Sequence, residues 1–404
     1  MNSSFCILGA VDLIAVLIGC LIFPPAKNKW VQQAKIVADN EAASEEFGRA
    51  IAIKGNTAAI AAPCDSVPSQ GEPKGTVHIY SQLGKTWSLQ AKLFVPQTQT
   101  GSYSFFGSSV AIDGNTVLIA ADSLNVANSS TPLYVFTRSS DRWHFQAQLE
   151  LPAPPQSPIY YQSVALAGDT AVAGTKGKVY IFRRHSPTGT WAYEAELKSC
   201  KPDYHFGDTV AIDGNTIIVS GGDRGCASAY VFVRSATGGW LQQAELTPRR
   251  RDVGYSNAIA FSGNTVIIGT PGENLQQGAA YVFERNPATG GWVQQTRLVP
   301  RDVPPFFAYG FGASVATDGD AIVVGTSTKT LTNVFGFTWN QGGAYVYVRA
   351  PVKGGWSQPT KLLPQTNEQV THYGEVVSIS GDRVMVTAGE SNNTAYIFKR
   401  VNSQ

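Results

Sequence analysis

The chain has 404 residues, of which 43% are hydrophobic, 11% aromatic and 15% charged. Its formal net charge is only +2, so there is no broad electrostatic case for binding nucleic acid. This length would accommodate two or three ordinary domains, but an internal repeat predicts a single one.

The first 29 residues form a separate hydrophobic segment. Phe5 to Phe23 are almost wholly apolar apart from Asp12, and Pro24-Pro25 end the run. This pattern suits an uncleaved membrane anchor or a cleaved export signal, and Leu17 to Cys20 resemble a lipobox that would lipidate Cys20. The three alternatives stay open. Each predicts that residues 30–404 lie outside the cytoplasm and meet a membrane only through this segment.

The same hairpin pattern recurs along the rest of the chain. In one copy Phe206-Gly207 precedes two apolar runs, which Gly214-Asn215 separates. A Gly-Asn pair tolerates the positive φ angles of a two-residue hairpin turn. The other copies begin at Phe47-Gly48, Phe106-Gly107, Tyr161-Gln162, Tyr255-Ser256, Phe311-Gly312 and Tyr373-Gly374. A period of about 45–60 residues is typical of repeat architectures.

Two more strand patterns follow each hairpin. The first is an apolar run with an aromatic end: Val77–Tyr80, Leu133–Phe136, Val179–Phe182, Ala229–Phe232, Ala280–Phe283, Ala344–Tyr347 and Ala395–Phe398. The second opens on a tryptophan: Trp87, Trp143, Trp191, Trp240, Trp292 and Trp356. Each unit is therefore predicted to be a four-stranded antiparallel meander, and neighbouring meanders must stack to bury their apolar faces.

The last unit lacks a tryptophan strand, but Trp30–Ile36 at the other end of the chain matches Trp240–Leu246. An open ring would expose a sheet edge, which promotes aggregation. We therefore predict an all-β, seven-bladed β-propeller of four-stranded antiparallel blades over residues 30–404. The N-terminal strand, about residues 30–37, completes the last blade, and the closed ring is expected to be a monomer.

The Phe-Gly pairs, the apolar hairpins and the Gly-Thr-Pro-Gly of Gly269–Gly272 resemble the FG-GAP repeat family, which includes the propeller of integrin α subunits. The resemblance implies an extracytoplasmic ring used for protein or carbohydrate contacts, as in cell adhesion. Integrin-like copies bind calcium through an Asp-rich loop, whereas a turn such as Asp213-Gly214-Asn215 offers one carboxylate to an ion that takes six to eight oxygens. No metal site and no cofactor are therefore expected.

Blade six contains the most unusual insertion, residues 327–342, with Phe335, Phe337 and Trp339. In a meander it emerges on the same face as the connection that contains Phe306 and Phe307. Aromatic residues on long loops are often recognition residues, so these five are the candidate binding residues. The alternative is that they fold back and plug the central channel.

The remaining candidates concern cysteines and glycosylation. Cys200 and Cys226 lie in connections that emerge on one face, so either a disulfide joins them or they are two independent buried thiols. Cys64 would stay unpaired in the first case. Glycosylation sequons begin at Asn128 and Asn392, in predicted surface connections.

We expect a non-enzymatic, extracytoplasmic propeller that presents a loop face to a protein or carbohydrate ligand, because no catalytic constellation is visible in the sequence. One alternative is a propeller enzyme, a glycosidase, lyase or hydrolase, with carboxylates gathered at the channel mouth. Its candidate residues are Asp203, Asp208, Asp252, Asp302 and Glu375. A purely structural repeat scaffold is the third possibility.

Overall fold

The computed structural model describes residues 28–38, 46–65, 75–96, 104–122, 132–150, 163–186, 188–199, 205–222, 227–250, 258–300, 302, 309–326, 331–332, 338–339, 342–350, 355–366, 370–388 and 393–402. The predicted export or anchor segment and Cys20 lie outside this part of the chain, apart from residues 28 and 29. No helix in the described part is long and apolar enough to span a bilayer.

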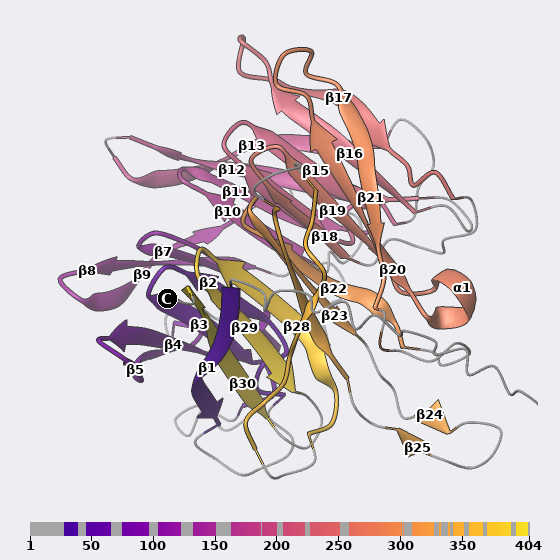
Figure 1. Cartoon of the computed structure of the whole chain (residues 1–404). Coiled ribbons are helices and arrows are strands. Elements are labelled where there is room, and N and C mark those ends of the chain that lie inside the picture. The colour runs from indigo at the N-terminus through magenta and orange to yellow at the C-terminus, as the bar shows by residue number, and fades with distance from the viewer. Residues whose placement is uncertain are drawn as a thin grey trace, which may run out of the picture.

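Apart from one two-stranded hairpin in blade six, the described strands form seven sheets of four antiparallel strands, arranged as the blades of a ring (Figure 1). Blade one contains β2 (Ile51–Lys54), β3 (Thr57–Ala62), β4 (Thr76–Leu83) and β5 (Thr86–Leu93). Blade two contains β6 (Ser104–Asp113), β7 (Thr116–Asp122), β8 (Leu133–Ser139) and β9 (Arg142–Leu149). Blade three contains β10 (Ser163–Ala167), β11 (Thr170–Thr175), β12 (Lys178–His185) and β13 (Thr190–Lys198). Blade four contains β14 (Val210–Asp213), β15 (Thr216–Gly221), β16 (Ser228–Arg234) and β17 (Trp240–Leu246). Blade five contains β18 (Ala258–Ser262), β19 (Thr265–Thr270), β20 (Ala279–Arg285) and β21 (Trp292–Leu298). Blade six contains β22 (Phe311–Thr317), β23 (Ala321–Thr326), β26 (Ala344–Val348) and β27 (Thr360–Leu362).

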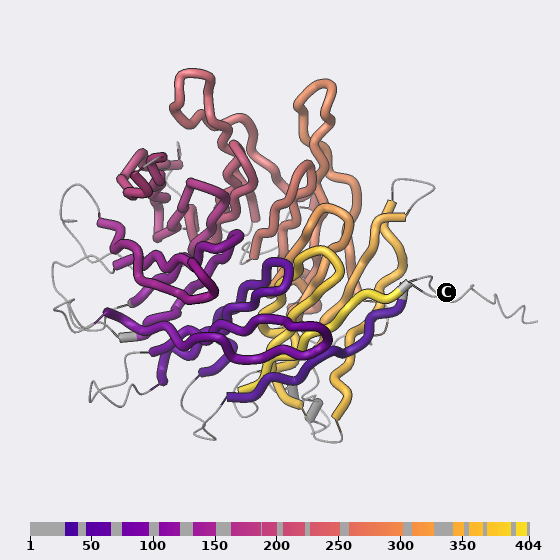
Figure 2. The backbone as a smooth tube through the Cα atoms, turned by 90° about the vertical axis from the view of Figure 1, so that its left-hand side faces the viewer, coloured from indigo at the N-terminus to yellow at the C-terminus, as the bar shows by residue number. Residues whose placement is uncertain are grey.

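The last blade closes the ring as predicted. It contains β28 (Tyr373–Ser380), β29 (Arg383–Ala388), β30 (Thr394–Asn402) and, from the other end of the sequence, β1 (Asn28–Val37). β1 pairs antiparallel with β30, from Asn28 opposite Asn402 to Val37 opposite Thr394. In Figure 2 the indigo and yellow strands run side by side.

Apolar layers between neighbouring blades form the core. Every residue of the second strands β3, β11, β15, β19 and β23 is buried. One typical layer joins Val172 and Ile181 of blade three to Ile217 and Phe232 of blade four. Because each layer needs two blades, a single blade has no complete core, and the predicted stacking is confirmed.

The Phe-Gly pair lies where neighbouring blades touch. Phe206 is fully buried, and its ring centroid lies 5.5 Å from that of Tyr230 and 6.1 Å from that of Phe232. Gly207 has a φ of +93°, and a Cβ atom there would lie 2.4 Å from the carbonyl oxygen of Thr175 in the preceding blade. Both the conformation and the space exclude a side chain at this position. The repeated motif therefore combines a core anchor with a close contact between blades.

Each blade joins its first two strands by a tight turn on the surface that we call the hairpin face. In blade four, Asp213 pairs with Thr216 and leaves a two-residue turn of Gly214 and Asn215. Gly214 has a φ of +55°, whereas Asn215 has no positive φ. A turn with positive φ at its first central residue needs glycine only there, as in type II′ hairpins. The second-to-third and fourth-to-first connections emerge on the opposite surface, the loop face.

The innermost strands have free edges toward the central channel, and side chains of the preceding blade bind their N–H groups. The Ser163 hydroxyl oxygen accepts a hydrogen bond from Val210 N (3.2 Å), and Asp213 Oδ2 accepts one from Gly263 N (2.7 Å). Equivalent bonds join Ser109 to Val164, Asp113 to Gly168, Ser314 to Val377, Ser378 to Ile53 and Ser380 to Gly55. These bonds satisfy N–H groups at the free strand edges, which would otherwise promote association, and they connect adjacent blades.

The outer strands of six blades carry a β-bulge at one shared position. The bulged residues are Gln33 in β1, Gln90 in β5, Gln146 in β9, Glu194 in β13, Gln243 in β17 and Gln295 in β21. A bulge redirects a side chain. At three junctions the redirected glutamine accepts a hydrogen bond from the tryptophan of the next blade: Trp143 Nε1 to Gln90 (3.1 Å), Trp191 Nε1 to Gln146 (3.0 Å) and Trp292 Nε1 to Gln243 (3.4 Å).

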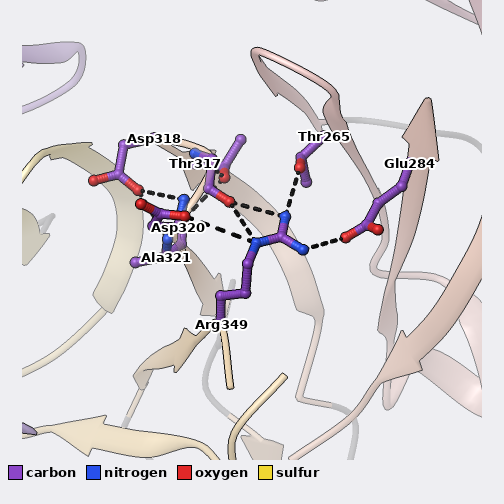
Figure 3. Close-up of polar contacts among 8 residues, drawn as sticks. Thr265, Glu284, Thr317, Asp318, Asp320, Ala321 and Arg349 are labelled. Atoms are coloured by element: carbon purple, nitrogen blue, oxygen red, sulfur yellow. Dashed lines mark hydrogen bonds and ion pairs between the residues drawn. The ribbon is translucent and has the colours of Figure 1, made fainter. Parts of the chain in front are cut away.

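Arginines at the ends of the third strands add a second set of contacts between blades, on the hairpin face. Arg349 Nη1 lies 2.7 Å from Glu284 Oε1, and its Nη2 donates to Thr265 Oγ1 (3.0 Å); both partners belong to blade five (Figure 3). The same guanidinium lies 4.7 Å from the ring centroid of Trp356. Arg138, Arg184 and Arg234 lie over Trp143, Trp191 and Trp240 in the same way. Side chains on the hairpin face therefore hold neighbouring blades together.

Candidate functional site

The most elaborate described structure on the loop face lies over blades five and six. Here the connection between β19 and β20 contains α1 (Glu273–Gln276), and an insertion in blade six contains β24 (Leu331–Thr332) and β25 (Thr338–Trp339). Figure 1 shows α1 and the β24–β25 hairpin on the same side of the ring. We call this region the loop-face site.

α1 is a left-handed turn and not an ordinary helix. Asn274, Leu275 and Gln276 have φ angles of 51°, 57° and 68°. Each residue with a side chain in this conformation costs roughly 1–2 kcal/mol, so the surrounding structure must hold the turn in place. Its apex, Leu275, is 79% exposed. Strain that supports an exposed apolar side chain is typical of recognition surfaces.

A buried carboxylate anchors this turn. Glu273 is 1% exposed and accepts hydrogen bonds from Tyr281 Oη (2.8 Å), Thr270 Oγ1 (3.2 Å) and Arg297 Nε (2.9 Å). Arg250 Nε lies 3.6 Å from the same side chain. Burial, followed by the hydrogen bond to Glu273, raises the pKa of Tyr281 to about 12, so the phenol stays a donor at neutral pH. These contacts hold the turn against blade five.

A second polar group lies in blade six. Tyr345 donates to Asp302 (3.0 Å to Oδ1), Lys361 Nζ lies 2.8 Å from Asp302 Oδ2, and the Tyr309 and Tyr345 hydroxyls lie 3.2 Å apart. Burial opposes the charge on Asp302, but hydrogen bonds from Lys361 and Tyr345 lower its pKa. Burial likewise opposes the charge on Lys361, and the bond to Asp302 raises its pKa. Both groups therefore stay charged at neutral pH.

The candidate aromatic residues fall mostly outside the described part of the chain. Phe306, Phe307, Phe335 and Phe337 lie there, and only the backbone of Trp339 is described. Trp339 pairs with Leu331 in the β24–β25 hairpin, which projects away from the blades in Figure 1. The assignment of these residues to binding thus stays a prediction.

The cysteine and glycosylation predictions have a similar outcome. Cys200, Cys226, Asn128 and Asn392 lie outside the described residues, so the disulfide stays a prediction. Cys64 is a free, half-buried thiol, and burial together with nearby Glu46 raises its pKa.

Of the carboxylates considered for an enzyme, the three that the structure describes have local partners. Asp208 lies 2.9 Å from His205 Nδ1, Asp302 is bound as above, and Glu375 lies 4.0 Å from Arg49. Asp203 and Asp252 are outside the described residues. Across the ranges that the structure covers, no three His, Cys, Asp or Glu side chains are placed to hold a metal ion.

The central channel is lined by all seven innermost strands. Its outer part, toward the loop face, is a cavity of about 520 Å³ with Arg49, Glu375, Ser108 and Ser109 among its lining residues. A deeper cavity of about 290 Å³ is lined mainly by alanine, valine and isoleucine. The channel thus has a polar mouth and an apolar interior.

Glu273 and its partners were not predicted from the sequence. One sequence feature could have indicated Glu273. It lies three residues after the end of β19, and Asp65 likewise lies three residues after the end of β3. Asp65 is also buried, and its Oδ2 accepts a hydrogen bond from Thr76 (2.7 Å). An acidic residue at this position therefore anchors the loop-face connection in two blades.

Comparison with known proteins adds one match. Residues 30–80 match the family model of the FG-GAP repeat; they comprise most of the closing strand, the hairpin of blade one and most of its third strand. A search of curated proteins finds no match. The Phe-Gly turn of the matched repeat recurs at Phe106-Gly107, Phe206-Gly207 and Phe311-Gly312. The chain folds as a seven-bladed β-propeller that contains a match to the FG-GAP repeat at residues 30–80.

Proposed function

We propose that this protein is a non-enzymatic, extracytoplasmic binding module that engages a protein or carbohydrate ligand through the loop-face site. The observation that carries the proposal is the difference between the two faces. On the hairpin face, side chains at the strand ends bind neighbouring blades, as Arg349 of blade six binds Glu284 of blade five. The loop face carries the insertions.

The left-handed turn of α1 supports a recognition role. A scaffold has no need to hold three strained residues around an exposed leucine, whereas backbone strain is concentrated at ligand-binding elements. Glu273 and backbone hydrogen bonds from Tyr309 N and Gly310 N to Gln276 O (2.8 and 2.7 Å) hold the turn rigid. A rigid surface loses less entropy on binding and so binds more tightly.

The predicted aromatic residues extend the same surface. The β24–β25 hairpin projects from the ring, and this favours recognition over plugging of the channel. Exposed aromatic side chains supply large contact areas and are often the residues that dominate binding energy.

Binding of the full-length chain to arrays of glycans and extracellular proteins tests the proposal. We expect at least one ligand whose affinity falls at least tenfold in the variant Phe335→Ala/Phe337→Ala/Trp339→Ala and in Leu275→Asp. The matched control is Leu83→Ala/Leu241→Ala/Val293→Ala, which removes three exposed apolar side chains near the hairpin face. Ligands that bind all variants equally would contradict the assignment of the site.

An enzyme is the second candidate, and a specific observation weighs against it. Paired carboxylates perform acid and base chemistry only when they converge on one substrate. Asp208, Asp302 and Glu375 instead bind His205, Lys361 and Arg49 respectively. Hydrolysis of glycan or peptide substrates that is lost in Glu375→Gln would overturn the binding proposal.

A further inference from the structure

The junction between blades five and six lacks a tryptophan hydrogen bond that three other junctions form on the outer rim of the ring. At three other junctions a bulged glutamine accepts a hydrogen bond from the tryptophan of the next blade, for example Gln243 from Trp292. Blades five and six retain both partners, Gln295 at the bulge and Trp356 in the next blade. Trp356 Nε1 is nevertheless buried and has no hydrogen-bond partner within the described part of the chain.

A pocket occupies this junction. It has a volume of about 390 Å³, in the range of small-molecule sites, and Gln295, Arg297, Tyr347, Trp356, Ser357 and Gln358 line it. It forms because the outer strand of blade six is short. β27 has 3 residues, whereas β21 has 7; Trp356 keeps only an isolated bridge to Arg349, and residues 357–359 separate it from β27.

A buried donor without a partner costs about 1–3 kcal/mol, so such a group in a native protein calls for an explanation. The buried Nε1 atoms of Trp30, Trp87 and Trp240 likewise have no hydrogen-bond partner within the described ranges. None of these residues lines the pocket. Trp356 does line it, so its donor faces a space that a ligand could enter.

The chemistry of the lining defines the ligand. The glutamine amides and the serine hydroxyl both donate and accept hydrogen bonds, and the indole N–H only donates. Among the described lining residues only Arg297 is charged, and Glu273 neutralises it through contacts of 2.9 and 2.7 Å. The pocket therefore suits an uncharged molecule with many hydroxyl groups, which can satisfy donors and acceptors together.

We propose that this pocket between blades five and six binds a neutral sugar residue, with Trp356 Nε1 donating to a sugar oxygen and Gln295 binding a neighbouring hydroxyl. The site lies on the outer rim, and Arg297 connects it to Glu273, the anchor of the loop-face turn. A glycan held here would be recognised by the edge of the ring.

The test uses the full-length protein with ¹⁵N-labelled tryptophan and observes the indole N–H resonances. The probes are glucose, galactose, mannose and N-acetylglucosamine, with glucuronate as an anionic comparison. We expect a neutral sugar to shift the Trp356 resonance saturably; loss of that resonance in Trp356→Phe gives its assignment. Trp356→Phe and Gln295→Leu should weaken binding about tenfold, measured by saturation-transfer NMR.

The matched controls are Trp292→Phe and Gln243→Leu at the junction of blades four and five, where the hydrogen bond is formed. They should leave sugar binding unchanged, as should the loop-face variant Phe335→Ala/Phe337→Ala/Trp339→Ala. The proposal is overturned if no neutral sugar shifts the Trp356 resonance, if glucuronate alone binds, or if Gln295→Leu binds as the native protein does. Loss of sugar binding in the loop-face variant would overturn the location.

Discussion

Asp213 Oδ2 accepts a 2.7 Å hydrogen bond from the backbone N–H of Gly263, the residue at the corresponding hairpin turn of the next blade. The bond joins the tip of one innermost strand to that of its neighbour. Asp113 makes the same contact with Gly168 (2.7 Å). In a calcium-binding loop such a carboxylate would be a metal ligand. In this protein the Asp213 carboxylate binds a backbone N–H group.

Replacing Asp213 with alanine should destabilise the ring. The change removes the acceptor of an exposed hydrogen bond, and water can then bind the N–H group of Gly263, so the loss should be about 0.5–1.5 kcal/mol. The free energy of unfolding in urea measures the loss. Asp213→Asn keeps an acceptor oxygen and should lose less; an equal loss would show that the hydrogen bond is not what matters.

Gly207 and Gly214 offer a matched test of the Phe-Gly motif. Both have positive φ, but a Cβ atom on Gly207 would lie 2.4 Å from a carbonyl oxygen, whereas one on Gly214 meets nothing within 4 Å. Gly214→Ala should cost about 1–2 kcal/mol from conformation alone. Gly207→Ala should cost clearly more, or prevent folding, because blades three and four must move apart. Similar melting temperatures for the two variants would refute the steric explanation.

Glu273→Gln should destabilise the left-handed turn. It removes the charge that Arg297 and Tyr281 bind, and hydrogen bonds to charged groups contribute about 1.5–3 kcal/mol. We expect a loss of that size by denaturant unfolding, together with faster hydrogen exchange at the amides of residues 274–277. Arg250→Ala is the control, since that side chain is mostly exposed and its ion pair should contribute below about 1 kcal/mol. Unchanged exchange in Glu273→Gln would mean that the backbone holds the turn alone.

The contact between Asp302 and Lys361 should give the stability a pH dependence. The pKa of Asp302 is lowered from 3.8 by its partners in the folded state. Its contribution is therefore complete above pH 3.8 and is lost as the pH falls through the folded value. The difference in unfolding free energy between native protein and Asp302→Asn should stay constant near neutral pH and shrink below pH 3.8. A difference that grows on acidification would contradict this assignment.

Ring closure can be tested on β1. Ile36 is 6% exposed, while its neighbour Val37 is 49% exposed. Ile36→Asp places a charge in the apolar layer that closes the ring, so it should lower the melting temperature strongly and favour association through the freed edge of β30. Val37→Asp should do neither. Calorimetry and light scattering measure the two effects.

The sequence was sufficient for the fold because each blade is specified locally. The Phe-Gly pair, the Gly-Asn turn and the tryptophan recur in order, and Trp30 identified the closing strand. The loop-face site was only partly predictable. Glu273 and Arg297 meet through a left-handed turn of ordinary residues, which no sequence pattern signals. The rim pocket depends on where β27 begins, a boundary that strand propensity does not fix.

The pairing of Asn28 with Asn402 determines how the ring can be attached to anything else. Third strands run from the loop face to the hairpin face, so β30 ends, and β1 begins, on the hairpin face. In Figure 1 the C-terminal end lies on the side opposite α1. A membrane tether attached at residue 28 would therefore hold the ring by its hairpin face. The loop-face site would then point away from the membrane.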